Sequence, residues 1–293
     1  MAAEIELPEP PVGRTPGGRL QGGVHELALR VRPTELGAVL KRLARIRRGY
    51  VRAADGSWFW VDPASQLGHA LTTTQAYEPE MEALLRAVLR PGDSFVDVGA
   101  NEGVFTVLAA QICGDGTVVA VEPQSRLLHV LHRNLEINGC TRVTVRALGL
   151  DAKPGWLRMY LRPSTNPGAS GLNRRRLDVL SELVPVSTLD AVVETARLGS
   201  VRLVKVDCEG AEDRVIAGSG GLLSAQRVTF LALEFHPTVG PDGLARSRAL
   251  HESLRSYGYV HSVVLGRHVY HVPGAEGALE AAGDVAVGAE FSL

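Results

Sequence analysis

Four polar side chains follow two apolar segments at the points where each segment ends: Asp207 and Glu209 after the first, Glu234 and His236 after the second. Because ligands bind at the carboxyl ends of the strands in an open α/β sheet, we expect these side chains to face a substrate. A positioned base can take the proton of a weakly nucleophilic hydroxyl. His236 is the first candidate because an unperturbed imidazole titrates near neutrality, with Glu234 or Asp207 orienting the ring or the acceptor.

Two other interpretations of these four residues are open. His236 could be a structural residue that caps the strand before Pro237. The four side chains could instead hold a divalent cation, since hard oxygen ligands suit magnesium and a bound metal lowers the pKa of a hydroxyl. The residue pattern alone predicts no metal, and metal dependence stays open.

A second set of polar residues lies in the loop after 94–98, where Ser-Phe-Val-Asp-Val is followed by Gly-Ala-Asn-Glu-Gly. The apolar run, the glycine turn and the helical spacing from Val104 predict a strand, a tight turn and a helix. Gly99 lets the backbone turn sharply, and free N–H groups at the helix start can bind a polar ligand. A dinucleotide site would have glycine where Asn101 and Val104 stand, so we expect a ligand with an amino acid end rather than a diphosphate.

Glu122 ends the next apolar segment, 117–121, and follows the loop by about twenty residues, the spacing of a ribose-binding acid in doubly wound sheets. Its two carboxylate oxygens can accept both ribose hydroxyls. An exposed acid at a strand end is the plainer interpretation, and the nearby glycine loop favours the ribose.

Taken in order, these motifs resemble the FkbM family of S-adenosylmethionine-dependent methyltransferases over about residues 77–236. The segments that carry the resemblance are 97–103, 121–123, 187–190 and 205–212. The last of them, Lys-Val-Asp-Cys-Glu-Gly-Ala-Glu, is the most specific, because Rossmann-like methyltransferases in general share only the first two. Glu102 is a departure, since the family commonly has an apolar residue there.

The resemblance implies S-adenosylmethionine as the cofactor and a Rossmann-like class I fold. The residues that it implies for cofactor binding are Glu78, Asp97, Gly99, Asn101, Glu122, Pro123, Asp151 and Asp207. Two of these have plainer interpretations: Glu78 precedes Pro79 and suits a helix start, and Asp151 opens Asp-Ala-Lys-Pro-Gly, which suits a turn.

The resemblance also implies the reaction, which is transfer of a methyl group to a hydroxyl of a small molecule such as a sugar or polyketide in specialised metabolism. Nitrogen is the alternative acceptor. A nicotinamide-dependent oxidoreductase is disfavoured by the missing glycines and by the Lys-x-Asp-x-Glu-Gly run.

The elements that must position these residues follow from the apolar periodicity, which predicts an α/β fold with a mostly parallel, seven-stranded sheet and helices on both faces. Lys205 lies in a strand that is covered on both faces, so its ammonium needs a carboxylate partner, for which we expect Asp97 on the adjacent strand. The expected strands are 95–98, 118–121, 143–147, 202–206 and 228–233, then a final hairpin of 259–264 and 267–272. The expected helices of the core are 77–89, 104–112, 125–138 and 246–257.

The chain divides into an N-terminal region, 1–76, a methyltransferase core, 77–272, and a tail, 273–293. In the N-terminal region we expect an arm rich in Pro and Gly, an amphipathic helix over 34–48, and a hairpin whose aromatic residues pack on the core. The basic face of the helix has no interleaved aromatic residues. This favours a solvated face or a homodimer contact over a nucleic-acid partner.

The longest polar stretch inside the core is 162–176, which is rich in Pro, Gly and Arg. Loops of this size in a compact domain are binding loops, lids or disordered segments. We expect this one to close over the acceptor, with an ordering that depends on ligand.

Composition sets the remaining limits: 293 residues with a net charge of −1 suit one large α/β core with no general attraction to nucleic acid or membrane. The cysteines, Cys113, Cys140 and Cys208, follow no disulfide spacing, which favours free thiols in a reducing compartment. The start of the chain has no signal-peptide pattern and no apolar run reaches transmembrane length. We therefore expect a cytoplasmic enzyme.

Overall fold

The computed structural model describes residues 27, 34–172, 174, 180–234, 243–265 and 268–273. Its central strands are β3 (Ser94–Val98), β4 (Thr117–Val121), β5 (Thr144–Arg146), β9 (Val201–Val206), β10 (Val228–Glu234), β11 (Tyr259–Leu265) and β12 (His268–Pro273). They form one seven-stranded sheet in the order β11-β12-β10-β9-β3-β4-β5. The strands from β5 to β10 pair in parallel, and β12 and β11 join antiparallel, which confirms the predicted sheet.

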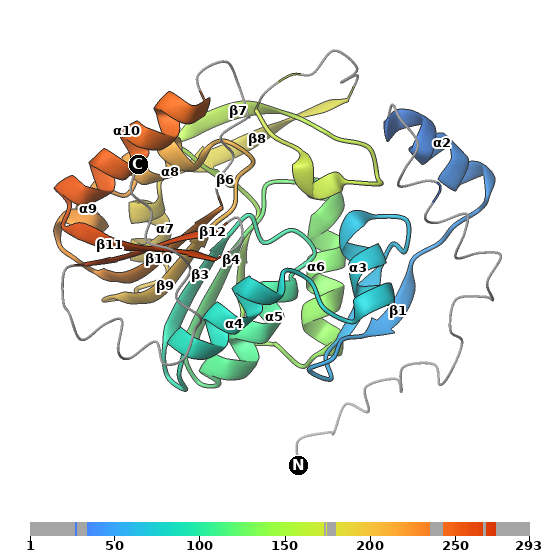
Figure 1. Ribbon diagram of the computed structural model, residues 1–293, viewed down its shortest axis with the longest axis horizontal. Helices are drawn as coiled ribbons and strands as arrows, with labels where there is room; N and C mark the ends of the chain where they lie inside the picture. Colours follow the sequence, from blue (N-terminus) through green and yellow to red (C-terminus); the bar gives the residue numbers. More distant parts are fainter. Residues whose placement is uncertain are drawn as a thin grey trace.

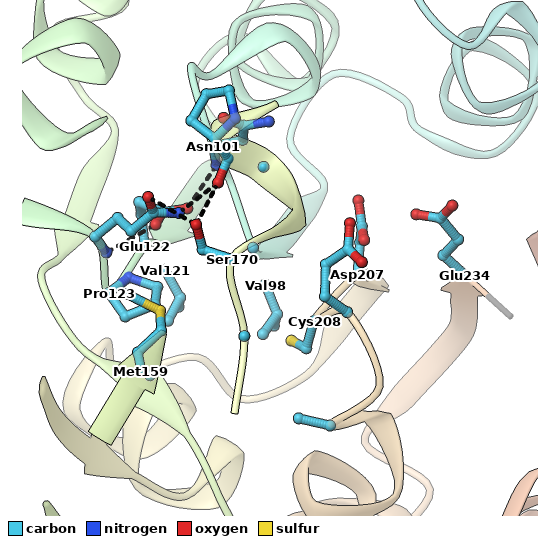
Figure 2. Close-up of a pocket in the computed structure, with 18 of the residues that line it drawn as sticks. Val98, Asn101, Val121, Glu122, Pro123, Met159, Ser170, Asp207, Cys208 and Glu234 are labelled. Atoms are coloured by element: carbon cyan, nitrogen blue, oxygen red, sulfur yellow. Dashed lines mark hydrogen bonds between the residues drawn. The ribbon is translucent and has the colours of Figure 1, made fainter. Parts of the chain in front are cut away.

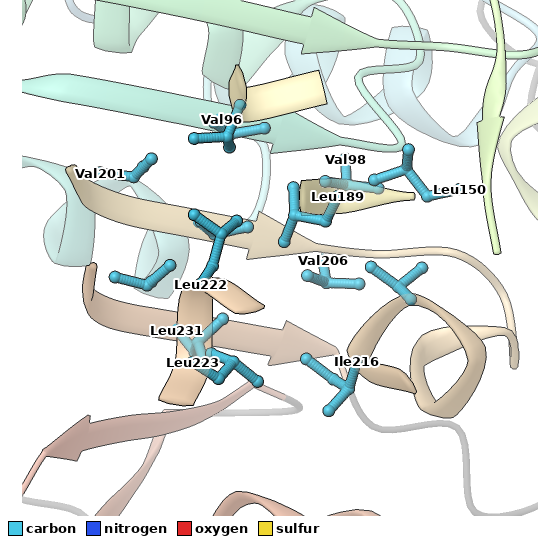
Figure 3. Close-up of a cluster of buried hydrophobic side chains, with 14 of the residues drawn as sticks. Val96, Val98, Leu150, Leu189, Val201, Val206, Ile216, Leu222, Leu223 and Leu231 are labelled. Carbon is cyan, nitrogen blue, oxygen red and sulfur yellow. The ribbon is translucent and has the colours of Figure 1, made fainter. Parts of the chain in front are cut away.

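Helices cover both faces of this sheet (Figure 1). They are α4 (Pro79–Val88), α5 (Val104–Cys113), α6 (Ser125–Ile137), α7 (Leu189–Thr195), α8 (Glu212–Ala217), α9 (Gly220–Ser224) and α10 (Gly243–Ser256). Successive residues of a strand point to opposite faces, so the apolar strands feed two separate cores. Val96 and Val98 pack with α7 to α10 (Figure 3), whereas Phe95 packs with α4 and α5 on the other face. None of the described helices is long and apolar enough to span a membrane.

The N-terminal region contributes helix α2 (Thr34–Leu43), a hairpin of β1 (Gly49–Arg52) and β2 (Trp58–Val61), and helix α3 (Gln66–Thr74). The predicted hairpin is confirmed, and it packs on α6, where Asn138 accepts from the backbone N–H of Trp58 at 2.9 Å and donates to its carbonyl at 2.7 Å. The helix predicted over 34–48 ends earlier, because the chain turns through Arg45 at a φ of 53°. Helix α3 was not predicted.

Helix α2 leaves an apolar stripe uncovered in the described part of the chain. Leu36, Val39 and Leu43 lie on one side of the helix with 53%, 55% and 76% of their surface exposed. A homodimer contact through this region stays a prediction.

A second sheet of three strands was also not predicted. It consists of β6 (Gly149–Leu150), β7 (Gly155–Tyr160) and β8 (Ser181–Ser187) in the order β6-β8-β7. In β7, the outward side chain of Trp156 is 64% exposed, whereas Met159 on the other face is buried. This sheet supplies a wall of the site.

Candidate functional site

A cavity of about 290 Å³ lies at the carboxyl ends of β3, β4, β9 and β10, the edge predicted to bind ligand. Figure 2 shows Glu122 and Glu234 at opposite sides of this pocket, with Asp207 between them. The predicted site residues that line it are Glu78, Gly99, Asn101, Glu122, Pro123, Asp207, Glu209 and Glu234. Predicted site residues from five separate segments of the chain therefore share one cavity.

The loop after β3 is held by its backbone and requires glycine at its first position. Gly99 has a φ of 81°, and a Cβ atom there would lie 1.9 Å from the backbone oxygen of Asp207. The N–H groups of Gly99 and Ala100 both donate to the carbonyl of Val121 at 3.0 Å. Asn101 has a φ of 53°, and its side-chain oxygen is buried without a hydrogen-bond partner in the described part of the chain. A ligand that donates hydrogen bonds can satisfy that oxygen.

Glu122 closes the loop from the next strand. One carboxylate oxygen accepts from the backbone N–H of Asn101 at 2.8 Å, and the other accepts from that of Gln124 at 2.8 Å. Burial raises the pKa of the Glu122 carboxyl to about 7, although these two N–H groups act in the opposite direction. Since a carboxylate oxygen has two lone pairs, each still has one to offer to a ligand hydroxyl.

Beside Glu122 the cavity wall is apolar. It is formed by a residue that follows β4 and by side chains of all three strands of the second sheet, namely Pro123, Leu150, Leu157, Met159, Val184 and Val186. Such a surface suits the face of a flat aromatic base. The run of aromatic and apolar residues in 155–160 was the signal in the sequence that could have located the strand.

Part of the segment 162–176 lines the pocket. It is held by hydrogen bonds, which its Pro- and Gly-rich sequence did not predict. Pro167, Gly168 and Ser170 line the cavity, and a short 3₁₀ turn spans Pro167–Ala169. The side-chain amide of Gln124 donates to the carbonyl of Pro167 at 3.0 Å, and the Ser170 hydroxyl donates to the same carbonyl at 2.7 Å. Whether this segment orders with ligand stays a prediction.

The opposite end of the pocket carries charge. The Lys205 ammonium is buried, 3.2 Å from a carboxylate oxygen of Asp207 and 3.6 Å from one of Asp97. The expected partner Asp97 is therefore present, and Asp207 is the nearer one. Burial alone would lower the pKa of Lys205, but the carboxylates of Asp207, Asp97 and Glu78 outweigh it and raise that pKa.

Two acids at this end have an unusual backbone. Glu78 and Glu209 line the pocket with φ values of 45° and 50°, in the left-handed region where a residue other than glycine is strained. Such strain, about 1–3 kcal/mol per residue, concentrates at functional sites. Beside Glu78, burial and the carboxylates of Glu78 and Asp207 raise the pKa of Tyr77 well above its usual value, so its hydroxyl stays neutral.

Two residues predicted to bind cofactor lie outside the cavity lining. Asp97 sits behind the loop, where it accepts from the Thr106 hydroxyl at 2.6 Å; burial raises the pKa of its carboxyl. The carboxylate of Asp151 accepts from the guanidinium of Arg214 at 2.8 Å, and only its neighbours Gly149 and Leu150 reach the pocket. An adenine contact by Asp151 stays a prediction, and Arg214 holds its carboxylate in the structure.

His236 lies outside the described residues, so its place relative to Glu234 stays a prediction. Within the described residues, no group of three or more His, Cys, Asp and Glu side chains is arranged to hold a metal ion. The three cysteines are free thiols, as expected.

Comparison with known proteins gives two family matches. Residues 97–260 match the methyltransferase FkbM domain, which is more than half of the chain. Residues 31–159 match the protein-L-isoaspartate (D-aspartate) O-methyltransferase family, which is less than half.

Two curated relatives are similar to the chain. Methyltransferase 1 of Beauveria bassiana is 29% identical over 148 residues, covering 44% of this chain and 59% of that protein. The AMB antimetabolite synthetase AmbE of Pseudomonas aeruginosa is 28% identical over 258 residues, covering 72% of this chain and 12% of the synthetase. The chain thus spans less than two thirds of each relative.

Solved structures of methyltransferases show a weaker likeness. A SAM-dependent methyltransferase from Aquifex aeolicus aligns with a TM-score of 0.38 and 14% identity, covering 66% of this chain and 87% of that one. The family assignment rests on the FkbM domain match, and the glycine loop, Glu122 and the charged strand ends fit it. The chain belongs to the FkbM family of S-adenosylmethionine-dependent methyltransferases.

Proposed function

We propose that this enzyme methylates a hydroxyl of an uncharged or cationic small molecule, of the sugar or polyketide type, in the cytoplasm. The charge of the pocket carries the proposal: the described residues that line it include six Asp and Glu and no Lys, Arg or His. Arg48 and Lys205, which pair with Glu102 and Asp207, lie outside the lining. The acids are Glu78, Glu102, Glu122, Asp207, Glu209 and Glu234. An anionic acceptor would meet like charge there, which costs several kcal/mol.

The cofactor end fits S-adenosylmethionine, which supplies a methyl group already activated by its sulfonium. Glu122 has a lone pair on each oxygen for the two ribose hydroxyls. The buried, unpaired side-chain oxygen of Asn101 suits the ammonium of the amino acid end. The apolar wall around Met159 and Val186 suits the adenine.

At the other end, the residues of the chain must orient the acceptor and remove its proton. The Asp207 carboxylate lies 3.2 Å from the Lys205 ammonium, and it can accept a hydrogen bond from a hydroxyl of the acceptor. With S-adenosylmethionine bound, its sulfonium would supply the methyl group to the acceptor oxygen, and His236 would take the hydroxyl proton. Glu234, at the end of β10, orients the imidazole or a second acceptor hydroxyl.

The acidic lining of the pocket also favours a second candidate, transfer to nitrogen. Carboxylates that accept a hydrogen bond from a hydroxyl also attract a protonated amine. The amine would have to lose a proton before it could attack, which the same base could achieve. Transfer to a carboxylate, as in the isoaspartate methyltransferases, is disfavoured by the acidic lining.

The test uses methyl-labelled S-adenosylmethionine and three acceptors that share one scaffold and differ only in carrying a hydroxyl, an amine or a carboxylate. We expect a methyl ether on the hydroxyl compound and transfer to the carboxylate at least about a hundredfold slower, as like-charge repulsion of several kcal/mol requires. NMR of the products identifies the methylated atom. A methyl ester formed as fast as the ether would contradict the proposal, and exclusive N-methylation would replace it with the second candidate.

A further inference from the structure

Glu102 is the residue at which the glycine loop departs from the family pattern, and the structure gives this acid a partner from outside the core. Its side chain is 1% exposed. Both carboxylate oxygens accept from the guanidinium of Arg48, at 2.8 and 2.9 Å. Arg48 immediately precedes β1, and the FkbM domain match begins only at residue 97.

We propose that Arg48 is a positioning residue for the cofactor loop, and that the N-terminal hairpin is thereby part of the S-adenosylmethionine site. The inference rests on cofactor binding alone and does not depend on which acceptor is methylated. It places the working boundary of the catalytic unit before residue 48, not at the 76/77 division expected from the sequence.

The hairpin itself holds Arg48 in place. The guanidinium donates to the carbonyl of Trp60 at 3.2 Å and lies 5.4 Å from the centre of its ring. A planar, forked guanidinium can make these contacts and a bidentate carboxylate pair together, which a lysine cannot. The side chain that holds Glu102 is thus itself fixed by β2.

A second bridge joins the same two parts through α6. The side-chain amide of Asn134 donates to the backbone carbonyl of Glu102 at 2.7 Å, and its oxygen accepts from the backbone N–H of Trp60 at 2.7 Å. The loop is therefore tied to the hairpin through the side chain of Glu102 and through its backbone.

The position of Glu102 within the loop explains why this matters for the cofactor. It stands between Asn101 and Gly103, whose φ values of 53° and 87° form the turn. Glu122 holds the pocket side of that turn through the N–H of Asn101, and Arg48 holds the other side. Without Arg48, the buried Glu102 carboxylate would have no opposite charge beside it, which is energetically costly. We expect the side chain to move toward water and to displace the neighbouring Asn101.

The experiment compares Arg48→Ala with Arg133→Ala by calorimetric titration of S-adenosylhomocysteine, well below the melting temperature of either variant. Arg133 is the matched control, because it also binds the hairpin, through the Tyr50 hydroxyl at 2.9 Å and ring at 5.9 Å, but does not contact the loop. We expect Arg48→Ala to raise the Kd about tenfold, within the range of coupling between distinct sites, and Arg133→Ala to leave it unchanged. Equal Kd values in the wild type and Arg48→Ala would overturn the proposal.

Two further variants keep the test decisive if Arg48→Ala fails to fold. Glu102→Gln keeps the shape of the side chain and removes its charge, so it should also raise the Kd. The double variant Arg48→Met, Glu102→Leu replaces the ion pair with an apolar pair, which proteins tolerate at buried sites, and should bind more tightly than Glu102→Gln. An unchanged Kd in Glu102→Gln would show that the pair does not position the loop. A double variant that binds S-adenosylhomocysteine no more tightly than Glu102→Gln would show the same.

Discussion

At the Glu122 end of the pocket the protein acts mainly through its backbone, whereas at the Asp207 end it acts through charged side chains. The first end is a turn of fixed φ angles with N–H groups bonded to Val121 and Glu122. The second is a set of carboxylates around one buried lysine. Backbone geometry suits the proposed cofactor, whereas the charged side chains suit the selection of a particular acceptor. Mutations at the Glu122 end should therefore weaken cofactor binding, whereas mutations at the Asp207 end should lower turnover.

The largest effect is expected at the acceptor end. His236→Ala should lower turnover by about 10² to 10⁴, the typical contribution of a positioned base, while the Kd for S-adenosylhomocysteine stays unchanged. Chelator should have no effect on the wild type, since the base alone removes the proton. Full turnover of the variant across pH 6 to 9 would make the histidine structural, and activity that chelator abolishes and magnesium restores would indicate a metal site instead.

A smaller effect, on binding rather than turnover, is expected from Gly99→Ala. Gly92 is the matched control, because it has a similar φ of 88° but no atom within 4 Å of an added Cβ. Both variants pay the backbone strain, but only Gly99→Ala must also displace the backbone of Asp207, 1.9 Å from the new atom. We expect cofactor affinity to fall about a hundredfold in Gly99→Ala and to hold in Gly92→Ala. Equal affinities in the two variants would show that the turn does not shape the site.

The smallest effect is a pH dependence at Glu122. Its pKa is raised from 4.5 to about 7 by burial, and hydroxyls donate better to the ionised form, so cofactor affinity should rise between pH 6 and 8 and then level off. Glu122→Ala should weaken binding about ten- to a hundredfold, and Glu122→Gln should abolish the pH dependence. Asp115→Ala serves as the control, because its carboxylate is exposed and pairs with Arg142 away from the cavity lining. A pH profile that survives in Glu122→Gln would assign the titration to another group.

The raised pKa of Glu122 should affect the free energy of unfolding in the opposite direction to cofactor affinity as pH rises. Between pH 4.5 and about 7 the folded protein holds a proton on Glu122 that the unfolded chain has lost. Stability from this group is therefore greatest at low pH and falls as pH rises through that window. The free energy of unfolding, measured between pH 4.5 and about 7, should therefore fall more steeply with rising pH in the wild type than in Glu122→Gln.

The parts of the fold that depend on local sequence pattern could be predicted. The strands around Val96 and Leu231, the glycine turn and the position of Glu122 at a strand end all follow from apolar runs that end in particular residues. The final antiparallel hairpin was predicted for the same reason.

The parts that depend on tertiary partners could not be predicted from pattern. The strand with Met159 faces a cavity on one side and exposes Trp156 on the other, so apolar residues lie on both faces and do not show which face is buried. The pairing of Arg48 with Glu102 joins residues far apart in sequence, and nothing local to either indicates the other. The pairing of Asp151 with Arg214 was missed for a related reason, because Arg214 lies in a helix that was not predicted.

The most direct test of the account is a crystal structure of the protein with S-adenosylhomocysteine. The account predicts that both ribose hydroxyls donate to the Glu122 carboxylate, that the adenine lies against Met159, and that the sulfur faces Asp207 and Glu234. A ribose bound elsewhere, with the amino acid end of the ligand at Glu122, would contradict it.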